Sequence, residues 1–396
     1  MKITLVGCGC GDLTLEAREA IDQADLLIGS GRLLKKHSGG RPAVEAITTE
    51  TIRETIRTAD CREICVLFSG DSGFYSGARQ LLPFLAGGQD EVLVLPGISS
   101  VQHLAARLCQ SWQDWNLYSA HGVDCDAVAA VCGGKQAFFL TGGKQSPDVL
   151  CRELTEAGLG FLRVSVGEDF GTEQERVRAG TAEEFAGETF SPLSVLLVDA
   201  APQPKRRSPG FPDESFLRSE RIPMTKQEVR AAALSKLGVG PDDICWDIGA
   251  GTGSMSVELA LQAKAVYAVE QSEEAFHLST ENRNKHAAWK LRLIRGTAPE
   301  ALKGLPRPDA VFVGGSGGRL REILRFIRST NAKARICVSA VSLENLQEAR
   351  KTLQALGYQV EVCQIAVSRS RAAGRLTMMM AQNPVWLICG RSRTEA

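Results

Sequence analysis

The sequence has no apolar run that approaches the length of a membrane-spanning helix, which argues against an integral membrane protein. Its first seven residues read as a strand and lack the pattern of a signal peptide. No two of the twelve cysteines have the C-x-x-C spacing, and most lie in apolar, strand-like settings. We therefore expect reduced thiols, no metal site (Cys8 and Cys10 included) and a location in the cytoplasm.

The net charge of the chain is zero, because two halves of opposite charge cancel. Residues 1–205 carry 18 Lys and Arg against 27 Asp and Glu, giving −9, whereas residues 206–396 carry 28 against 19, giving +9. This asymmetry predicts two modules, of which the basic one would tolerate an anionic substrate. We expect one domain at 1–200, with lobes of about 1–115 and 116–200, a proline-rich linker at 201–215, and a second domain at 216–396.

The most informative stretch is 244–260, where a short apolar strand, a glycine turn and an apolar-periodic helix follow one another. Glycines let the backbone approach a ligand, and the helix N-terminus offers free N–H groups, so this unit is typical of a nucleotide-binding α/β sheet. A second strand ends at Glu270, an acid suited to the ribose hydroxyls of an adenosine. Alternating strands and helices follow, which predicts a doubly wound sheet.

With Asp247 before the glycines, this pattern resembles the class I S-adenosylmethionine-dependent methyltransferases. The resemblance implies that the cofactor contacts Thr225, Gly249, Ala250, Gly251, Thr252, Gly253, Glu270 and Ala298. Thr225 is also a candidate N-cap for the helix that follows it, and capping alone would explain its presence.

Three strands in the first half end in loops of small residues, at about 7–12, 69–77 and 96–100. Such loops predict a ligand crevice at the carboxyl edge of a mostly parallel sheet, although each loop alone could simply make a turn. The motifs G-x-G-x-G-D, S-G-D-x-x-F-Y-x-x-G and P-G-I-S-S in these loops resemble the tetrapyrrole methylase family, whose two α/β lobes bind S-adenosylmethionine between them. The resemblance implies cofactor contacts at Cys10, Gly70, Asp71, Phe74, Ser99, Ser100 and Thr141.

Two residues depart from that family, since Cys10 and Ser72 stand where it often has proline. Because proline stiffens a loop by fixing φ, we expect looser loops here that keep their backbone donors. His121 has two interpretations, a proton carrier or a loop histidine satisfied by its neighbours.

The fourth strand of the second half ends in the glycine-rich loop 314–318, where enzymes that methylate exocyclic amines usually place Asn/Asp-Pro-Pro-Tyr/Phe. An open loop of this kind suits a bulky ligand, so Gly315, Ser316 and Gly317 are candidate substrate contacts. Three arginines could hold substrate carboxylates or form a solvated edge, namely Arg369, Arg371 and Arg375. We expect the methionines at 378–380 to fill the core.

The order of the two modules resembles a family of decarboxylating corrin-pathway methyltransferases of cobalamin biosynthesis. That resemblance implies two S-adenosylmethionine sites per chain, methyl transfer to carbons 5 and 15 of a tetrapyrrole precorrin, and loss of the ring C acetate carboxyl as carbon dioxide. Methyl transfer to an electron-rich carbon needs placement more than acid or base catalysis, and no catalytic residue is indicated. We expect a homo-oligomer without nucleic-acid or membrane partners. Two alternatives remain, an RNA methyltransferase in the basic half and a non-catalytic binding role for the first half.

Overall fold

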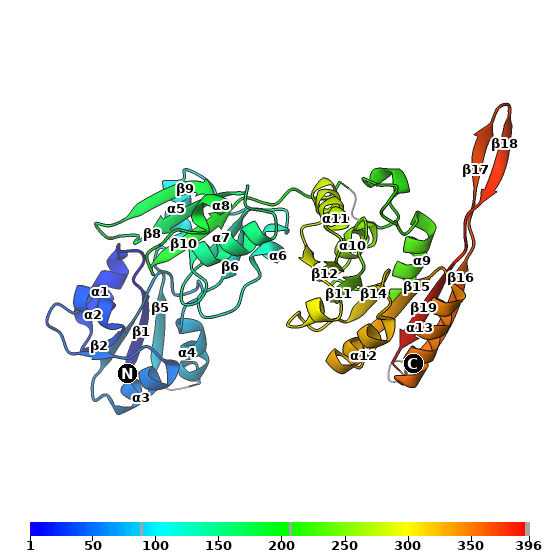
Figure 1. Ribbon diagram of the computed structural model, residues 1–396. Coiled ribbons are helices and arrows are strands. Elements are labelled where there is room, and N and C mark those ends of the chain that lie inside the picture. Colours follow the sequence, from blue (N-terminus) through cyan, green and yellow to red (C-terminus); the bar gives the residue numbers. More distant parts are fainter. Residues whose placement is uncertain (88–89, 206–207, 393–396) are drawn as a thin grey trace. The chain divides into compact units, whose positions relative to one another are not determined.

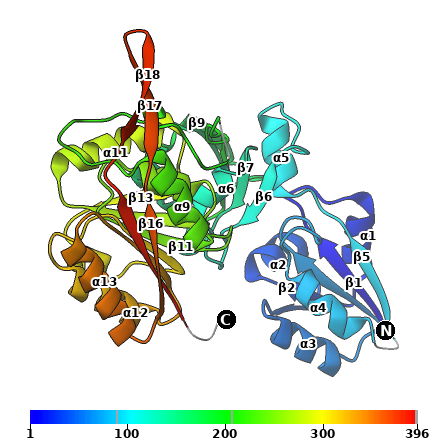
Figure 2. The same ribbon diagram turned by 90° about the vertical axis from the view of Figure 1, so that its right-hand side faces the viewer.

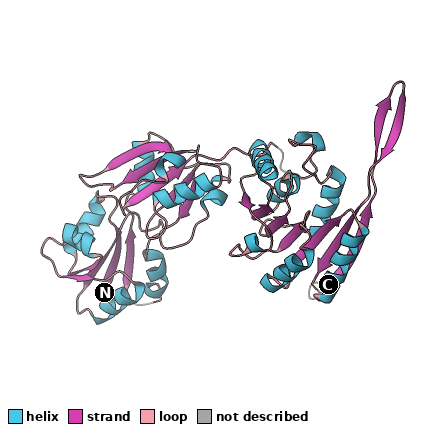
Figure 3. Ribbon diagram, in the orientation of Figure 1, coloured by secondary structure: helices cyan, strands magenta, loops and turns pink. Residues whose placement is uncertain are grey.

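The structure is a computed structural model that describes residues 1–87, 90–205 and 208–392. It divides into two compact units, at residues 1–201 and 202–396. Helices flank the sheets in both units (Figure 3). No helix within the described ranges is both long and apolar enough to cross a bilayer.

The first sheet of the first unit has five parallel strands in the order β3-β2-β4-β1-β5 (Figure 1). Its strands are β1 (Lys2–Gly7), β2 (Leu26–Gly29), β3 (Ala43–Glu45), β4 (Glu63–Phe68) and β5 (Glu91–Leu95). Its helices are α1 (Leu15–Gln23), α2 (Gly31–His37), α3 (Thr49–Thr58) and α4 (Ala78–Leu85). Buried side chains of α1 and α2 form one core cluster with the strands, and those of α3 and α4 form another.

The second sheet of this unit is mixed, with the order β6-β7-β10-β8-β9 and a parallel pairing only between β6 and β7. Its strands are β6 (Asn116–Ser119), β7 (Ala137–Leu140), β8 (Arg163–Glu168), β9 (Arg176–Thr181) and β10 (Ser194–Val198). Its helices are α5 (Ser100–Arg107), α6 (Ala127–Val131), α7 (Pro147–Glu156) and α8 (Ala182–Phe185). Two sheets of different character confirm the predicted two-lobed α/β fold.

The second unit contains a seven-stranded sheet in the order β13-β12-β11-β14-β15-β19-β16, in which β19 runs antiparallel to both neighbours. Its strands are β11 (Ile244–Ile248), β12 (Ala265–Glu270), β13 (Leu291–Arg295), β14 (Ala310–Val313), β15 (Arg335–Ala340), β16 (Gln359–Ile365) and β19 (Val385–Arg391). Its helices are α9 (Gln227–Leu237), α10 (Ser254–Ala260), α11 (Glu273–Lys285), α12 (Leu320–Thr330) and α13 (Leu343–Ala355), with 3₁₀ turns at Asp213–Ser215 and Glu300–Leu302. One core cluster holds side chains of α9 and α10, and another holds those of α12 and α13. The predicted doubly wound sheet is confirmed.

A two-stranded hairpin, β17 (Ser368–Ala373) and β18 (Leu376–Ala381), projects beyond the rest of the second unit (Figures 1 and 2). All six residues of β18 are exposed, including Met378, Met379 and Met380. The prediction that these methionines fill the core is wrong, because the chain leaves the main sheet between β16 and β19 and returns without packing them.

The segment 208–216 differs from the expected linker. The side chains of Phe211 and Phe216 are buried in the core cluster beneath α9 and α10, and Asp213 is 1% exposed. The aromatic anchors Phe211 and Phe216 fix this part of the chain to the second unit.

Candidate cofactor sites

The glycine turn after β11 comes into backbone contact with two other segments. Gly249 has a φ of +73°, and a Cβ there would lie 2.5 Å from the carbonyl oxygen of Gly315. A Cβ on Gly251, whose φ is +57°, would lie 2.8 Å from the carbonyl oxygen of Pro223. Only glycine fits both positions, so the turn, the strand-four loop and the segment before α9 enclose one pocket.

This pocket has a volume of about 240 Å³. It brings together nine of the predicted residues, namely Thr225, Gly249, Ala250, Gly251, Glu270, Ala298, Gly315, Ser316 and Gly317. Two others do not line it: Thr252 is 1% exposed, and Gly253 packs against Ser279.

Glu270 at the end of β12 is 8% exposed and lines the pocket. Its Oε2 accepts a hydrogen bond from the Gly251 N–H at 2.8 Å, and its Oε1 accepts one from the Ser272 N–H at 2.9 Å. The carboxylate therefore stabilises the glycine turn, and each oxygen keeps a lone pair that a ribose hydroxyl could use. An acid on the pocket wall and a cradle that any Cβ would fill both fit a bound adenosine.

Asp247 lies behind this turn and is buried at 1% exposure. Burial raises the pKa of its carboxyl to about 7, against the opposing effect of the hydrogen bond that the Ser256 hydroxyl donates to Oδ2. The hydrogen bond between Asp247 and Ser256 joins the end of β11 to α10, and the buried carboxyl has a pKa near neutrality.

Thr225 does not cap α9, so that alternative for the residue is wrong. The N-cap is Lys226, which makes no side-chain cap bond. Asp213 takes over this role, because its Oδ1 accepts a hydrogen bond from the Gln227 N–H at 2.9 Å. Thr225 instead lines the pocket, and its carbonyl oxygen accepts a hydrogen bond of 2.6 Å from Nη1 of Arg230.

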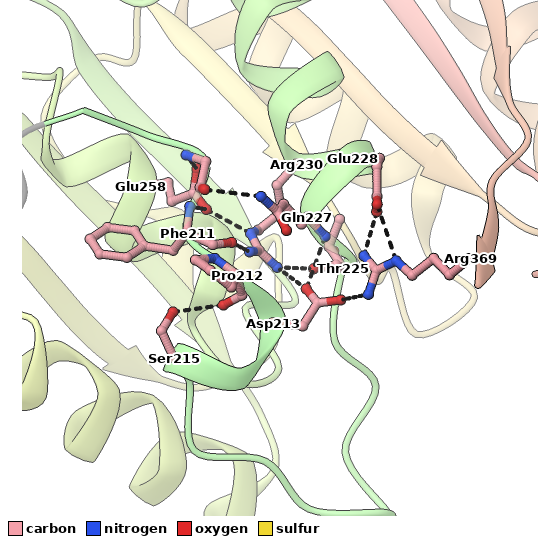
Figure 4. A network of polar contacts seen from close by, with 11 residues as sticks. Phe211, Pro212, Asp213, Ser215, Thr225, Gln227, Glu228, Arg230, Glu258 and Arg369 are labelled. Carbon is pink, nitrogen blue, oxygen red and sulfur yellow. Dashed lines mark hydrogen bonds and ion pairs between the residues drawn. The ribbon is translucent and has the colours of Figure 1, made fainter. Parts of the chain in front are cut away.

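Arg230 is the centre of a buried ionic network (Figure 4). Its guanidinium is fully buried and donates to Glu258 at 2.8 Å and to Asp213 at 2.9 Å. Glu258 in turn accepts hydrogen bonds from the N–H groups of Gly210 and Phe211. The network ties the segment before α9, and with it one wall of the pocket, to the helices beneath.

The predicted substrate arginines lie elsewhere. Arg369, at the start of β17, makes a bidentate pair with Glu228 at 2.6 and 3.1 Å, and its Nη1 lies 3.1 Å from Asp213 Oδ2 (Figure 4). Arg371 and Arg375 are exposed in the hairpin and are not among the residues that line the pocket. The structure therefore does not bring these three side chains to the glycine loop 315–317.

The first unit contains a cavity of about 680 Å³ at the carboxyl edge of its parallel sheet. All seven predicted contacts line it, namely Cys10, Gly70, Asp71, Phe74, Ser99, Ser100 and Thr141. Paired hydrogen bonds of 2.9 and 3.3 Å join Gly9 to Gly70. Asp71 accepts from the N–H groups of Gly73 at 2.8 Å and Gly97 at 3.2 Å, so one carboxylate connects the second and third loops. The small residues and backbone groups that line the cavity at this edge fit a nucleoside cofactor.

Ser72 and His121, two residues singled out from the sequence, make specific contacts here. The Ser72 hydroxyl donates to the carbonyl oxygen of Leu95 at 3.2 Å, a bond that proline could not make. His121 lines the cavity, and its Nδ1 lies 3.3 Å from the carbonyl oxygen of Thr141.

The turn between β8 and β9 forms another wall of this cavity. Glu175 accepts hydrogen bonds from Arg107 at 2.6 Å, from the Gly171 N–H at 2.8 Å and from His103 at 3.1 Å. Burial alone would raise the pKa of this carboxyl, but these donors lower it to about 2. Glu175 thus fixes the turn against α5, with Gly171 packed on the backbone of Cys10.

Sequence reasoning missed the part of the lining that carries no motif. Five of these residues come from α2, and the others come from the end of β8, the turn after it and the segment that leads into β10: Arg32, Leu33, Lys35, Lys36, His37, Gly167, Phe170, Gly171, Thr172 and residues 192–195. The only signal in the sequence was the spacing of the three cations in α2.

Comparisons with known proteins find one family model within each unit. The family model described as tetrapyrrole (corrin/porphyrin) methylases matches residues 2–186, and the model described as precorrin methyltransferase domain matches residues 217–389. A relative from Sinorhizobium, named precorrin-6Y C(5,15)-methyltransferase (decarboxylating), is 30% identical over 86% of this chain and 85% of its own. The chain belongs to this family. It is accordingly an S-adenosylmethionine-dependent methyltransferase, and the RNA alternative gains no support.

Shorter relatives match about half of the chain. A protein of Pyrobaculum calidifontis, named probable cobalt-precorrin-6B C(15)-methyltransferase (decarboxylating), is 45% identical over 46% of this chain and 95% of its own. A crystal structure from Geobacter metallireducens, described as precorrin-6y C5,15-methyltransferase, is 36% identical over 46% of this chain and 96% of its own, with a TM-score of 0.44.

Proposed function

We propose that this chain methylates precorrin-6Y at carbons 5 and 15 and removes the ring C acetate carboxyl as carbon dioxide, giving precorrin-8X. Each unit would bind one S-adenosylmethionine, so that one chain holds two methyl-transfer sites. The observation that carries the proposal is the presence of two separate cavities, each walled by the small-residue loops of its own sheet.

The bound cofactor supplies an activated methyl group on a sulfonium. The chain's own residues would bind and orient this cofactor: in the second unit, Glu270 holds the glycine turn and Thr225 lines the same pocket. Gly315, Ser316 and Gly317 also line this pocket and add no bulky side chain to it. Because the accepting carbon is electron-rich, placing the methyl group near it is sufficient for transfer. No side chain has to remove a proton from a nucleophile. The conjugated ring would act as the electron sink for decarboxylation.

The assignment of each reaction to a unit rests on the family resemblance, in which the C-terminal half is assigned carbon 15 and the decarboxylation. The Pyrobaculum protein is named for carbon 15 and decarboxylation alone, and it matches a length close to that of one unit. We assign these two steps to the second unit and methylation of carbon 5 to the first.

Calorimetric titration of S-adenosylhomocysteine into the full chain tests the two-site proposal. Asp71→Ala and Glu270→Ala form a matched pair, since each removes the carboxylate that holds the loop amides of one cavity. Two sites, each weakened at least about 10-fold in one variant only, are expected from the loss of charge-assisted hydrogen bonds. A single site, lost only with Glu270→Ala, would show that the first unit is a binding or docking domain.

We also propose a homo-oligomer in the cytoplasm. Support for self-association comes from the hairpin, where Leu376 is 73% exposed and Met379 is 66% exposed. Support for a reducing compartment comes from the cysteines, all twelve of which are free and six of which are buried.

A further inference from the structure

Three cations lie on one face of α2 in the first unit. Arg32, Lys35 and Lys36 have the i, i+3, i+4 spacing that places side chains together on a helix surface. Their neighbours Leu33 and Leu34 are buried against the sheet, so the amphipathic pattern of the helix turns the cationic face away from the core. All three cations line the large cavity.

These cations lack acidic partners. Seven other Lys and Arg side chains of this unit lie within 4.0 Å of a carboxylate. Among the described residues none of the three α2 cations has such a partner, although the first half of the chain carries nine more acids than bases. Arg32 donates to the Ser69 hydroxyl at 3.0 Å, and Lys36 lies 3.5 Å from the carbonyl oxygen of Gly11. Their charge is therefore concentrated in an otherwise acidic module.

The cavity itself does not neutralise this charge. Within the described part of the chain, Asp71 is the one carboxylate among the lining residues, and its oxygens already accept two loop N–H groups. The pKa of the adjacent His37 is lowered by burial and then by Lys36, Arg18 and Arg32, which indicates a positive local field. A site of this kind attracts an anion with several charges.

The volume leaves room for such a ligand beside a cofactor. By the same measure the cavity of the first unit is about 680 Å³ and the pocket of the second unit about 240 Å³. The small-residue loops lie at the carboxyl ends of β1 and β4, whereas the cations come from the helix after β2. Small-residue loops and the cationic helix thus form distinct parts of one lining.

We infer that α2 is the carboxylate-binding helix of the first unit, and that Arg32, Lys35 and Lys36 hold acidic side chains of the tetrapyrrole substrate. The inference rests on the proposed function, since it assigns residues to the carbon 5 site. It adds a specificity element: the ring would be oriented by pairing its peripheral carboxylates with one helix face.

The test compares methylation at carbons 5 and 15 in the full chain, with the methyl positions resolved by NMR of the product. Lys35→Gln/Lys36→Gln should raise the KM for the carbon 5 step at least about 10-fold, since two charge-assisted contacts with substrate carboxylates are lost. The carbon 15 step serves as an internal control. Arg163→Gln is the matched variant, because this exposed cation begins β8 and is not among the lining residues.

Two further readouts separate substrate binding from loss of the cofactor site. S-adenosylhomocysteine should still bind at two sites per chain in the double variant. Uroporphyrin, a stable tetrapyrrole with eight carboxylates, should bind more weakly and with a smaller salt dependence than in wild type, and its octamethyl ester should show no difference. If Lys36→Gln disturbs the Gly11 loop, Lys35→Glu gives the same test, because no bond of Lys35 is found among the described residues.

An unchanged carbon 5 KM, or an equal effect of Arg163→Gln, would overturn the inference. Failure of the proposed function looks different, because the wild type itself would then not methylate carbon 5. The uroporphyrin titration would still decide whether α2 binds carboxylates.

Discussion

The two units hold their cavities together in different ways. In the first unit, loops from three strands meet through backbone pairs and one half-exposed carboxylate, Asp71. In the second unit, the glycine turn after β11 is held by Glu270, and a fully buried arginine holds the segment before α9 that contacts this turn. The first arrangement joins its loops through backbone bonds and a partly exposed acid, while the second depends on a buried acid and a buried ionic network.

This difference predicts which substitutions affect only their immediate surroundings and which destabilise a whole unit. Loss of one contact in the first unit leaves other loop contacts in place, because none of them is a deeply buried charge. Loss of Arg230 in the second unit would leave Asp213 and Glu258 buried without their main cation.

The largest expected effect is therefore that of Arg230→Met. Removing one partner of a buried ion pair costs about 3–5 kcal/mol, because the remaining charges are uncompensated. Calorimetric unfolding should show a much lower Tm for the transition of the second unit and an unchanged transition for the first.

Arg369→Met is the matched control for this prediction, since it touches the same Asp213 but its side chain is 34% exposed. Its cost should be about 1 kcal/mol or less, because solvent screens the pair. Equal losses in the two variants would show that burial does not decide the strength of the network.

The contrast between contacts fixed by neighbouring residues and contacts made by distant ones also explains what the sequence revealed. Gly249 and Gly251 could be predicted because spacing along the chain fixes their geometry. The role of Asp213 as the cap of α9 could not, because it lies 14 residues before the N–H that it binds. The cavity face of α2 was missed for the same reason: only the sheet order places it beside the loops. The prediction that the methionines fill the core was wrong because composition does not distinguish a core strand from a projecting one.

Asp247 in the second unit should give an unusual pH dependence of stability. Burial raises its folded-state pKa to about 7 from the ordinary 3.8, so the native state binds the extra proton. This group therefore destabilises the second unit progressively as pH rises from about 4 to 7. Asp247→Asn should raise the free energy of unfolding by about 2 kcal/mol at pH 8, and much less at pH 4.5. The exposed Asp242→Asn is the control, and a gain that does not vary with pH would contradict the assignment.

Glu175 in the first unit should give stability the opposite dependence on pH. Its donors hold the folded-state pKa at about 2, below the ordinary 4.5, so its contribution is present above pH 4.5 and is lost as pH falls toward 2. Glu175→Gln should cost about 1–2 kcal/mol at neutral pH through weaker hydrogen bonds. The difference from wild type should disappear in acid when the first transition is followed by calorimetry. A difference that persists at pH 2.5 would mean that shape, and not charge, holds the β8–β9 turn.

The smallest expected effect on stability is that of changing the hairpin of the second unit. Among its described residues, the first unit exposes at most two consecutive large apolar side chains, Leu93 and Val94, whereas Leu376, Met378, Met379 and Met380 all lie within the six residues of β18. An isolated two-stranded hairpin is only marginally stable in water, so these side chains are better explained by a partner than by the fold.

Met378→Lys/Met380→Lys changes one face of this hairpin, since these residues pair with Arg371 and Arg369 across the strands. It should alter the unfolding of the unit by less than about 0.5 kcal/mol, as is usual for exposed positions. Sedimentation should nevertheless show a smaller particle than wild type, because two added charges oppose burial of that face in an interface. Met379→Lys alters the other face, opposite Ser370, and distinguishes which side associates. A wild-type chain that already sediments as a monomer would contradict the proposed oligomer and leave the hairpin as a surface for a different partner.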